Sequence, residues 1–209
     1  PWIKLILVLS YLLFLLLTKR YQIDSKVGDK KRRLLGNYFF TNNDGTIMVE
    51  FSFVYRKDDQ GNFVLLDDAR FDPIFQYLSD AGIVLLNHQG EPRNCWLPLE
   101  EMTVASDREY FAAHPEYHMF KNKHYPSYES HMAARDRVLE RFPKLNYVGL
   151  HLFSMEYDLE EVAKRLDRFP NSQTDLAERI CHVQLQTMHN REKVRQFFID
   201  YQDRILYGT

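Results

Sequence analysis

From residue 72 onward, helical and strand patterns alternate along the chain. Amphipathic stretches predict helices over about 72–81, 127–142, 158–169 and 190–201, and short apolar runs predict strands over about 83–86, 146–150 and 205–207, with a short strand or turn at 172–175. Such alternation is typical of parallel strands joined by helical crossovers. The sequence therefore predicts an α/β fold, with parallel strands and with helices packed outside them.

Helix starts and turns support these assignments. Asp72 with Pro73 at the first helical position, Ser127, Asp158 and Asn190 are all residue types that cap helices. Glu161, three residues after Asp158, completes a pattern like a capping box. The region between 87 and 126 reads as one long polar loop, and 47–55, rich in β-branched and aromatic residues, as an additional strand.

The first residues differ in kind from the rest of the chain. Residues 2–17 are apolar except for Lys4 and Ser10, and Lys and Arg residues follow them. This run is slightly shorter than the roughly 17–25 residues of a membrane helix. If it spans a membrane, the positive charge after it places the rest of the protein in the cytoplasm. A buried core helix, or non-native sequence at the edge of a fragment, remains the alternative.

The composition limits the kinds of partner that this protein can bind. The chain has 209 residues, of which 45% are hydrophobic and 27% charged, enough for one large core. A net charge of -2 and a pI near 6.5 give no basic footprint for nucleic acid. Cys95 and Cys181 lie too far apart to suggest a metal-binding pair or a disulfide framework. We therefore expect a cytoplasmic protein that does not bind nucleic acid, with contact to a membrane through 2–17 and oligomerisation both left open.

Two histidines follow predicted strands. His88 lies two residues past the strand core at 83–86, and His151 comes directly after the strand at 146–150. Because ligands of parallel α/β folds bind at the carboxyl ends of the strands, we expect both rings to face one shared cavity. Two imidazoles placed in this way suit a divalent metal or acid–base chemistry. The alternative is that each is an ordinary hydrogen-bonded histidine at a strand end.

Other polar residues are weaker candidates. Glu91 and Asp175 could orient a ligand, although such residues are more often found in turns and caps. The acidic stretch 156–161 favours a helix start over a site. The remaining histidines lie in predicted helices or polar loops, where we expect solvated or satisfied rings: His114, His118, His124, His131, His182 and His189.

Four blocks of the sequence carry a resemblance to a known family. They begin HQGEPRNCWLPLEEMTV, YPSYESHMAARDRVLERF, LEEVAKRLDRFPNSQTDLAERI and REKVRQFFIDYQDRILYGT. In this order they resemble the second half of the amidohydrolase-related metal-dependent hydrolases, a group of TIM barrels that includes aminocarboxymuconate-semialdehyde decarboxylase and gamma-resorcylate decarboxylase. The resemblance runs from about Gly61 to Thr209. It implies a (β/α)8 barrel, here partial or truncated, and a small-molecule substrate.

The resemblance also implies a site. Family members hold a metal with a His-x-His pair on strand one, a histidine on strand five and an aspartate at the end of strand eight, with a further histidine on strand six. His88 matches the strand-five ligand, and His151 matches the strand-six histidine, which takes part in catalysis or in secondary ligation of the metal. Zinc is the expected metal. Glu91 and Asp175 match no family ligand and remain candidates for supporting roles.

The chain also departs from the family pattern. It contains no His-x-His, and the family aspartate would follow Thr209, where the sequence ends. Phe153 stands where relatives tend to have Gly, and we expect its ring to fill space near the metal.

Two hypotheses follow. The chain is a fragment or damaged copy of a metal-dependent hydrolase, with a decarboxylase of the same fold as a variant, or it is a non-catalytic relative that binds a partner. We divide it into a candidate membrane anchor or non-native segment at 1–20, a linker and irregular region at 21–60, and a barrel portion at 61–209. With one matched ligand, the isolated chain is expected to bind zinc weakly or not at all and to lack hydrolase activity.

Overall fold

The computed structural model describes residues 39–41, 47–52 and 57–208. The apolar segment 2–17, its predicted helix and most of the predicted linker lie outside these residues. Within the described part of the chain, no helix is both long enough and apolar enough to cross a membrane.

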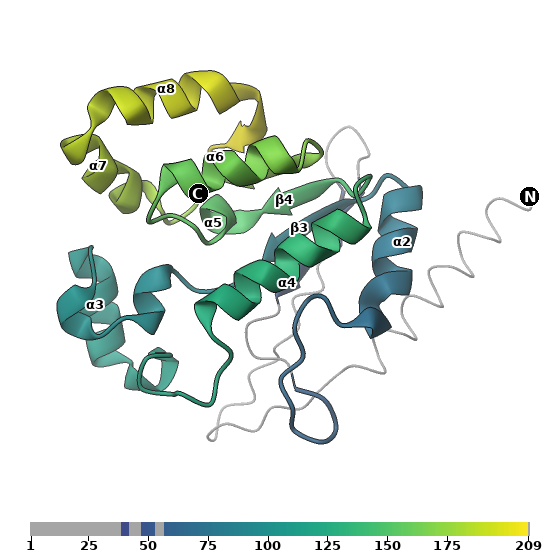
Figure 1. Ribbon diagram of the computed structural model, residues 1–209, viewed down its shortest axis with the longest axis horizontal. Helices are drawn as coiled ribbons and strands as arrows, with labels where there is room; N and C mark the ends of the chain where they lie inside the picture. The colour runs from purple at the N-terminus through teal and green to yellow at the C-terminus, as the bar shows by residue number, and fades with distance from the viewer. Residues whose placement is uncertain (1–38, 42–46, 53–56, 209) are drawn as a thin grey trace, which may run out of the picture.

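A single sheet of six strands forms the centre of the molecule (Figure 1). In chain order the strands are β1 (Phe39–Thr41), β2 (Ile47–Ser52), β3 (Val84–His88), β4 (Tyr147–Gly149), β5 (Ser172–Asp175) and β6 (Ile205–Leu206). They lie side by side in that same order. The pair β1–β2 is antiparallel, and every later neighbour is parallel. The predicted α/β fold with parallel strands is confirmed, and it has the form of part of a barrel.

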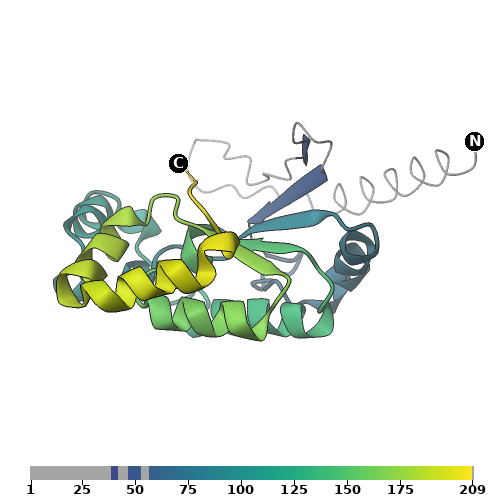
Figure 2. The ribbon, with the colours of Figure 1, turned by 90° about the horizontal axis from the view of Figure 1, so that it is seen from above.

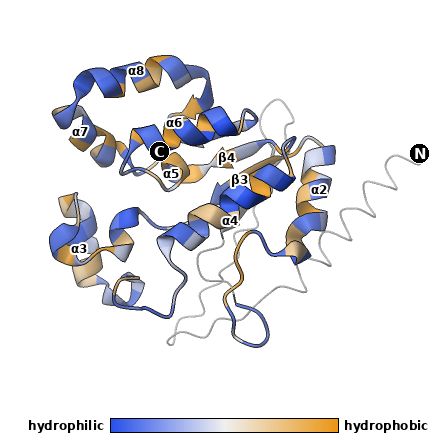
Figure 3. Ribbon diagram, viewed as in Figure 1, coloured by the Kyte–Doolittle hydropathy of each residue, from blue (hydrophilic) through white to orange (hydrophobic). Residues whose placement is uncertain are grey.

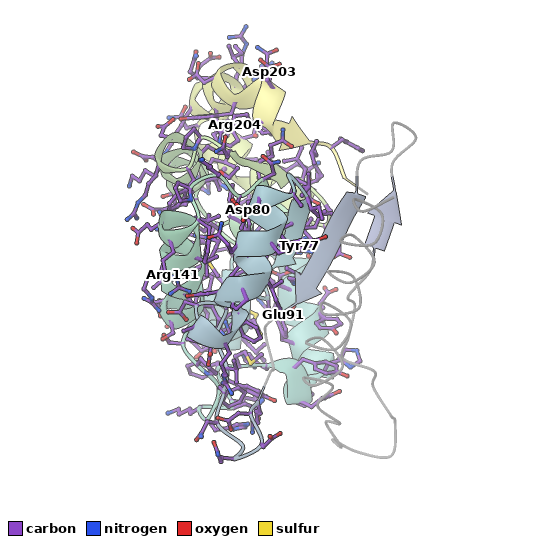
Figure 4. The ribbon with its side chains drawn as sticks, turned by 90° about the vertical axis from the view of Figure 1, so that its right-hand side faces the viewer. Tyr77, Asp80, Glu91, Arg141, Asp203 and Arg204 are labelled. Atoms are coloured by element: carbon purple, nitrogen blue, oxygen red, sulfur yellow. The ribbon has the colours of Figure 1, made fainter. Side chains whose placement is uncertain are left out.

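The α-helices of the described residues are α2 (Asp72–Asp80), α3 (Ala105–Ala113), α4 (Tyr128–Arg141), α5 (Leu150–Phe153), α6 (Leu159–Arg168), α7 (Ile180–His189) and α8 (Arg191–Tyr201). Of these, α4, α6 and α8 form a layer on one side of the sheet (Figure 2). Figure 2 shows α4, α6 and α8 beneath the sheet, and Figure 4 shows Arg141 on the outer side of this layer. The outer surface of α4 is hydrophilic (Figure 3), as expected for a helix that buries only its other face.

Strand alternation decides which side chains reach each face. Leu85 and Asn87 of β3 are buried, whereas Leu86 and His88 are only half-buried. Because successive side chains of a strand point to opposite faces, His88 lies on the side of the sheet away from the helical layer. Asp175 on β5 shares that face, since the parallel register pairs Asn87 with Gly149 and Gly149 with Thr174.

Three of the predicted helix caps are confirmed. Ser127, Asp158 and Asn190 accept hydrogen bonds from the backbone N–H groups of Ser130, Glu160 and Lys193, respectively.

Two details of the predicted helix starts are wrong. Phe71 precedes α2, and Asp72 is its first residue, with its carboxylate 2.7 Å from Arg141. The Glu161 carboxylate pairs with Lys164 and Arg165 instead of returning to the cap. In both cases a nearby cation competes for the carboxylate.

The expected long polar loop between β3 and α4 is instead a folded lobe. It contains α3 and short 3-10 turns at Arg93–Trp96, Leu99–Glu101 and Pro115–Tyr117. Cys95, Met102, Phe111 and Met119 form its own small core. Sequence patterning missed α3 because the helix has no side-chain cap and buries one residue, Phe111. Figure 1 shows α3 beyond the same end of the sheet as α7.

Candidate functional site

His88 and His151 lie against each other at the carboxyl ends of β3 and β4. Their ring centroids are 4.8 Å apart, with the rings edge to face. The Nδ1 atom of His151 lies 2.8 Å from the carbonyl oxygen of Ala177. A carbonyl only accepts hydrogen bonds, so Nδ1 carries the proton and Nε2 keeps a free lone pair. The prediction that the two rings lie together at one end of the sheet is confirmed, whereas the shared cavity expected in front of them stays a prediction. We call this end the mouth, defined by His88, Glu91, His151, Asp175 and Arg179.

The electrostatics of the mouth favour a neutral His88. Burial lowers the pKa of His88 to about 4, and the electrostatic effects of the neighbouring His151 and Arg179 act in the same direction. The buried Nε2 atom of His88 has no hydrogen-bond partner among the described residues. An uncharged imidazole with an unpartnered nitrogen is the form that binds a metal.

Glu91, the first carboxylate candidate, follows β3 by three residues and is half-buried (labelled in Figure 4). Burial raises the pKa of its carboxyl, although the charges of Arg179 and His151 oppose that shift. Glu91 therefore keeps its proton at higher pH than an exposed glutamate does.

Asp175, the second carboxylate candidate, positions His151. Its Oδ1 atom accepts the backbone N–H of His151 at 2.5 Å. Gly208, which follows β6 with a φ of +58°, lies so close that a Cβ there would be 3.2 Å from Asp175 Oδ2. The chain after β6 therefore returns to the mouth, beside Asp175.

A left-handed turn carries His151 out of β4. His151, Leu152, Phe153 and Ser154 all have φ between 56° and 58°. Each non-glycine residue in this conformation costs roughly 1–2 kcal/mol, so the surroundings must hold the turn in place.

Side chains from outside the turn supply that support. Tyr128 donates its hydroxyl to the Ser154 carbonyl at 2.5 Å, and Arg135 donates to the Phe153 carbonyl at 2.6 Å. The Ser154 hydroxyl donates to the Gly90 carbonyl at 2.7 Å, which ties this turn to the segment after His88. The turn that carries His151 is thus fixed by hydrogen bonds donated from α4, and its bond to the Gly90 carbonyl keeps it beside the loop that follows His88.

The expectation that the Phe153 ring fills space near the metal is wrong. Its ring is fully buried and stacks at 6.1 Å from the Tyr147 ring, with the Arg135 guanidinium 5.3 Å from its centroid. The left-handed turn rotates this side chain to the helix side of the sheet, over Gly149. Phe153 therefore fills the core and not the space beside the histidines.

Sequence reasoning missed four residues that lie around the mouth. Arg179 and His182 are buried in the segment after β5, Glu156 is fully buried after the left-handed turn, and Asp107 comes from α3. Arg179 follows Asp175 by four residues, and its place just after a strand end could have indicated it. The expectation of ordinary rings also fails for some other histidines: His118 and His131 are buried, each with Nδ1 unpartnered among the described residues.

An ion pair joins the α3 lobe to α7 across this region. His182 Nε2 lies 3.2 Å from Asp107 Oδ2, and Asn94 Nδ2 donates to the same oxygen at 2.8 Å. Burial would raise the pKa of Asp107, but the contacts with His182 and Asn94 outweigh burial and hold that pKa below 3.8.

Asp107→Asn is expected to destabilise the fold by about 1–3 kcal/mol at neutral pH, because it leaves His182 without its charged partner. The folded-state pKa lies below the unfolded value, so the Asp107 carboxylate stabilises the fold above about pH 4, and that contribution is lost as the pH falls through the folded pKa. Urea unfolding at several pH values should show the difference between wild type and variant shrinking below pH 4. Exposed Asp203 gives the control Asp203→Asn, expected within about 0.5 kcal/mol of wild type. A difference independent of pH would contradict the ion-pair explanation.

The described residues offer part of a metal site. The unpartnered Nε2 of His88 and the free lone pair of His151 suit a divalent metal. No group of three His, Cys, Asp or Glu side chains is arranged to hold a metal within the described ranges. The two nitrogens therefore fit a divalent metal in their chemistry, but by themselves they do not make a complete set of ligands.

A cavity of about 320 Å³ lies elsewhere, among residues that follow α4 and α6, including Phe142, Pro143, Phe169 and Pro170. These residues precede β4 and β5, so the cavity is at the amino ends of the strands. In barrels of this kind that face serves stability, whereas chemistry takes place at the opposite end. We therefore place the candidate site at the histidine pair.

The fold and the site define a class: an α/β protein with a partial parallel barrel and a histidine pair at the carboxyl ends of its strands. The family model described as amidohydrolase matches residues 30–209, and the chain belongs to the amidohydrolase family. No curated protein sequence matches it. An uncharacterized TIM-barrel protein from Bordetella bronchiseptica is similar in structure, with 18% identity and a TM-score of 0.42 over 70% of this chain. The chain spans 40% of the length of that protein.

Proposed function

We propose that the mouth is the catalytic centre of a metal-dependent hydrolase that acts on a small molecule. The observation that carries this proposal is the unpartnered Nε2 of His88 beside the His151 ring, at the carboxyl ends of parallel strands. Membership of the amidohydrolase family supports a hydrolytic or related decarboxylating reaction.

Each residue has a distinct part in the proposed reaction. His88 Nε2 would hold the divalent metal, with zinc as the candidate, and the metal would polarise the scissile group and lower the pKa of water. His151 would take a proton from the attacking water at Nε2 and return it to the leaving group. The Ala177 carbonyl and the Asp175 carboxylate fix the ring tautomer and the backbone of His151.

Zinc titration of metal-free protein tests the metal site. His88→Ala is expected to weaken zinc binding at least tenfold, because it removes the buried, unpartnered Nε2 atom that lies at the mouth. His189 is exposed at the end of α7, so His189→Ala is the matched control and should bind zinc as wild type does. Because two imidazoles are fewer than the three protein ligands of a usual catalytic zinc site, we expect weak binding. Equal zinc affinity in wild type and His88→Ala would refute the assignment.

Analysis of the reaction products distinguishes the proposed hydrolysis from a decarboxylation at the same site. A hydrolase consumes water and splits its substrate, whereas a decarboxylase of the same fold releases CO₂. His151→Gln should keep zinc binding and lose turnover of any substrate found, since the amide has no proton-accepting nitrogen. CO₂ release without hydrolysis would favour the decarboxylase.

A further inference from the structure

Arg179 is a buried cation that lacks a full set of partners. It is 7% exposed, and its Nε atom has no hydrogen-bond partner among the described residues. One terminal nitrogen donates to the Glu178 carbonyl at 3.2 Å and lies 3.7 Å from the Glu178 carboxylate, which is 73% exposed. A guanidinium has five donors, so the bonds of Arg179 leave donor capacity unused in a place where that is costly.

The position of Arg179 relates it to the mouth. Arg179 follows Ala177 by two residues, and the Ala177 carbonyl oxygen lies 2.8 Å from His151 Nδ1. In agreement with this position, the charge of Arg179 lowers the pKa of His88 and opposes the rise in the pKa of Glu91. Glu178, immediately before it, has a φ of 57°, and this left-handed residue turns the chain between β5 and α7.

The start of α7 adds further unused donors. Arg179 is the N-cap of this ten-residue helix, no side chain caps the helix, and its first turn holds no acidic residue. The first N–H groups to bond in this turn are those of His182 and Val183, both to the Arg179 carbonyl. The preceding N–H groups of Ile180 and Cys181 therefore stay available, at the positive end of the helix dipole.

We propose that Arg179 and the first N–H groups of α7 form a subsite that binds a carboxylate of the substrate. This inference rests on the proposed function, because it places the carboxylate beside the His88–His151 pair where the reaction would occur. A carboxylate accepts two parallel N–H bonds from a guanidinium, which matches the free edge of Arg179.

The acids around Arg179 favour a singly charged carboxylate over a phosphate. Glu91, Glu156 and Asp107 all interact electrostatically with Arg179. Burial raises the pKa of Glu91 and of Glu156, so both carboxyls are held toward their neutral forms. Their neighbourhood can therefore admit one negative charge, whereas a phosphate dianion would meet the Asp107 carboxylate with twice that charge.

Neutralising buried Glu156 is the competing role for Arg179. The Glu156 Oε1 atom accepts the Arg93 N–H at 2.8 Å, whereas Oε2 has no hydrogen-bond partner among the described residues. The ion pair recorded for Arg179 is with Glu178 and not with Glu156. Glu156 Oε2 and Arg179 Nε thus both lack a hydrogen-bond partner among the described residues, so neither group satisfies the other.

Propionate is a suitable probe, and propionamide is its neutral counterpart. In metal-free protein at fixed ionic strength, amide NMR should show millimolar propionate binding, with the largest shifts at Ile180 and Cys181 and in the Arg179 Nε–H signal. Propionamide should cause none of these shifts, and inorganic phosphate should bind at least fivefold more weakly than propionate. Shifts elsewhere, or equal shifts with propionamide, would overturn the proposal without any variant being needed.

Variants then test the arginine itself. Arg179→Gln should weaken propionate binding at least tenfold, whereas Arg165→Gln should leave it unchanged. Arg165 is the control, since it is also mostly buried but lies on α6, where its Nε atom is 3.4 Å from Asp136 Oδ2. Unchanged propionate affinity in folded Arg179→Gln would overturn the subsite. Metal-free protein keeps this result separate from zinc binding. Wild-type protein that binds propionate but no zinc would refute the hydrolase, and wild-type protein that binds zinc but no propionate would refute the subsite.

Discussion

Replacing Arg135 by Met is expected to destabilise the protein by roughly 3–5 kcal/mol, because it removes one partner of a buried ion pair. Arg135 is fully buried, and its Nη2 atom lies 2.7 Å from Asp136 Oδ1. The same guanidinium donates to the Phe153 carbonyl at 2.6 Å. Met fills much of the volume but leaves that carbonyl without its donor and Asp136 with weaker partners.

Urea unfolding measures this difference, and Arg137→Met is the matched control. Arg137 is two residues along α4 and pairs with Asp67 at 2.6 Å, but half of its side chain is exposed. Exposed pairs contribute at most about 1 kcal/mol, so the control should stay within that range. If Arg135→Met were no more destabilising than the control, Arg135 would not be what holds the left-handed turn.

Gly149→Ala is expected to cost about 3 kcal/mol, at the upper end of the usual range for overpacking. A Cβ at this position would lie 2.7 Å from Cε1 and 2.8 Å from Cγ of the Phe153 ring. The ring cannot move away, because it is fully buried between Tyr147 and Arg135. Differential scanning calorimetry and urea unfolding should both report the loss.

A double-mutant cycle identifies the cause. If the clash with the ring is responsible, Gly149→Ala should cost much less in a Phe153→Leu background than in wild type. Gly90→Ala serves as the control, since the nearest atoms to its Cβ are 3.6 Å away, at ordinary contact distance. Additive costs of Gly149→Ala and Phe153→Leu would show that the backbone, and not the ring, requires glycine.

The histidine pair and its surroundings differ in how far they could be predicted. His88 and His151 were placed together from strand ends alone, because parallel strands bring their carboxyl ends to one edge whatever the rest of the chain does. Asp175 was a candidate for orienting a ligand, and the structure shows it bonded to the His151 backbone. Arg179 carried no local signal beyond its place after a strand, because its burial depends on segments far from it in sequence.

The sequence by itself determined the parallel α/β architecture, the caps at Ser127, Asp158 and Asn190, and the meeting of the two histidines. These features follow from local periodicity and from short-range hydrogen bonds. Only the tertiary structure decided the left-handed turn at 151–154, the burial of Phe153 in the core and the folded lobe around α3. The turn is held by hydrogen bonds from α4 and by the bond that Ser154 donates to the Gly90 carbonyl. The lobe is held by packing of its own apolar residues. Such long-range contacts outweigh the local preference of non-glycine residues for negative φ, and no window of the sequence contains them.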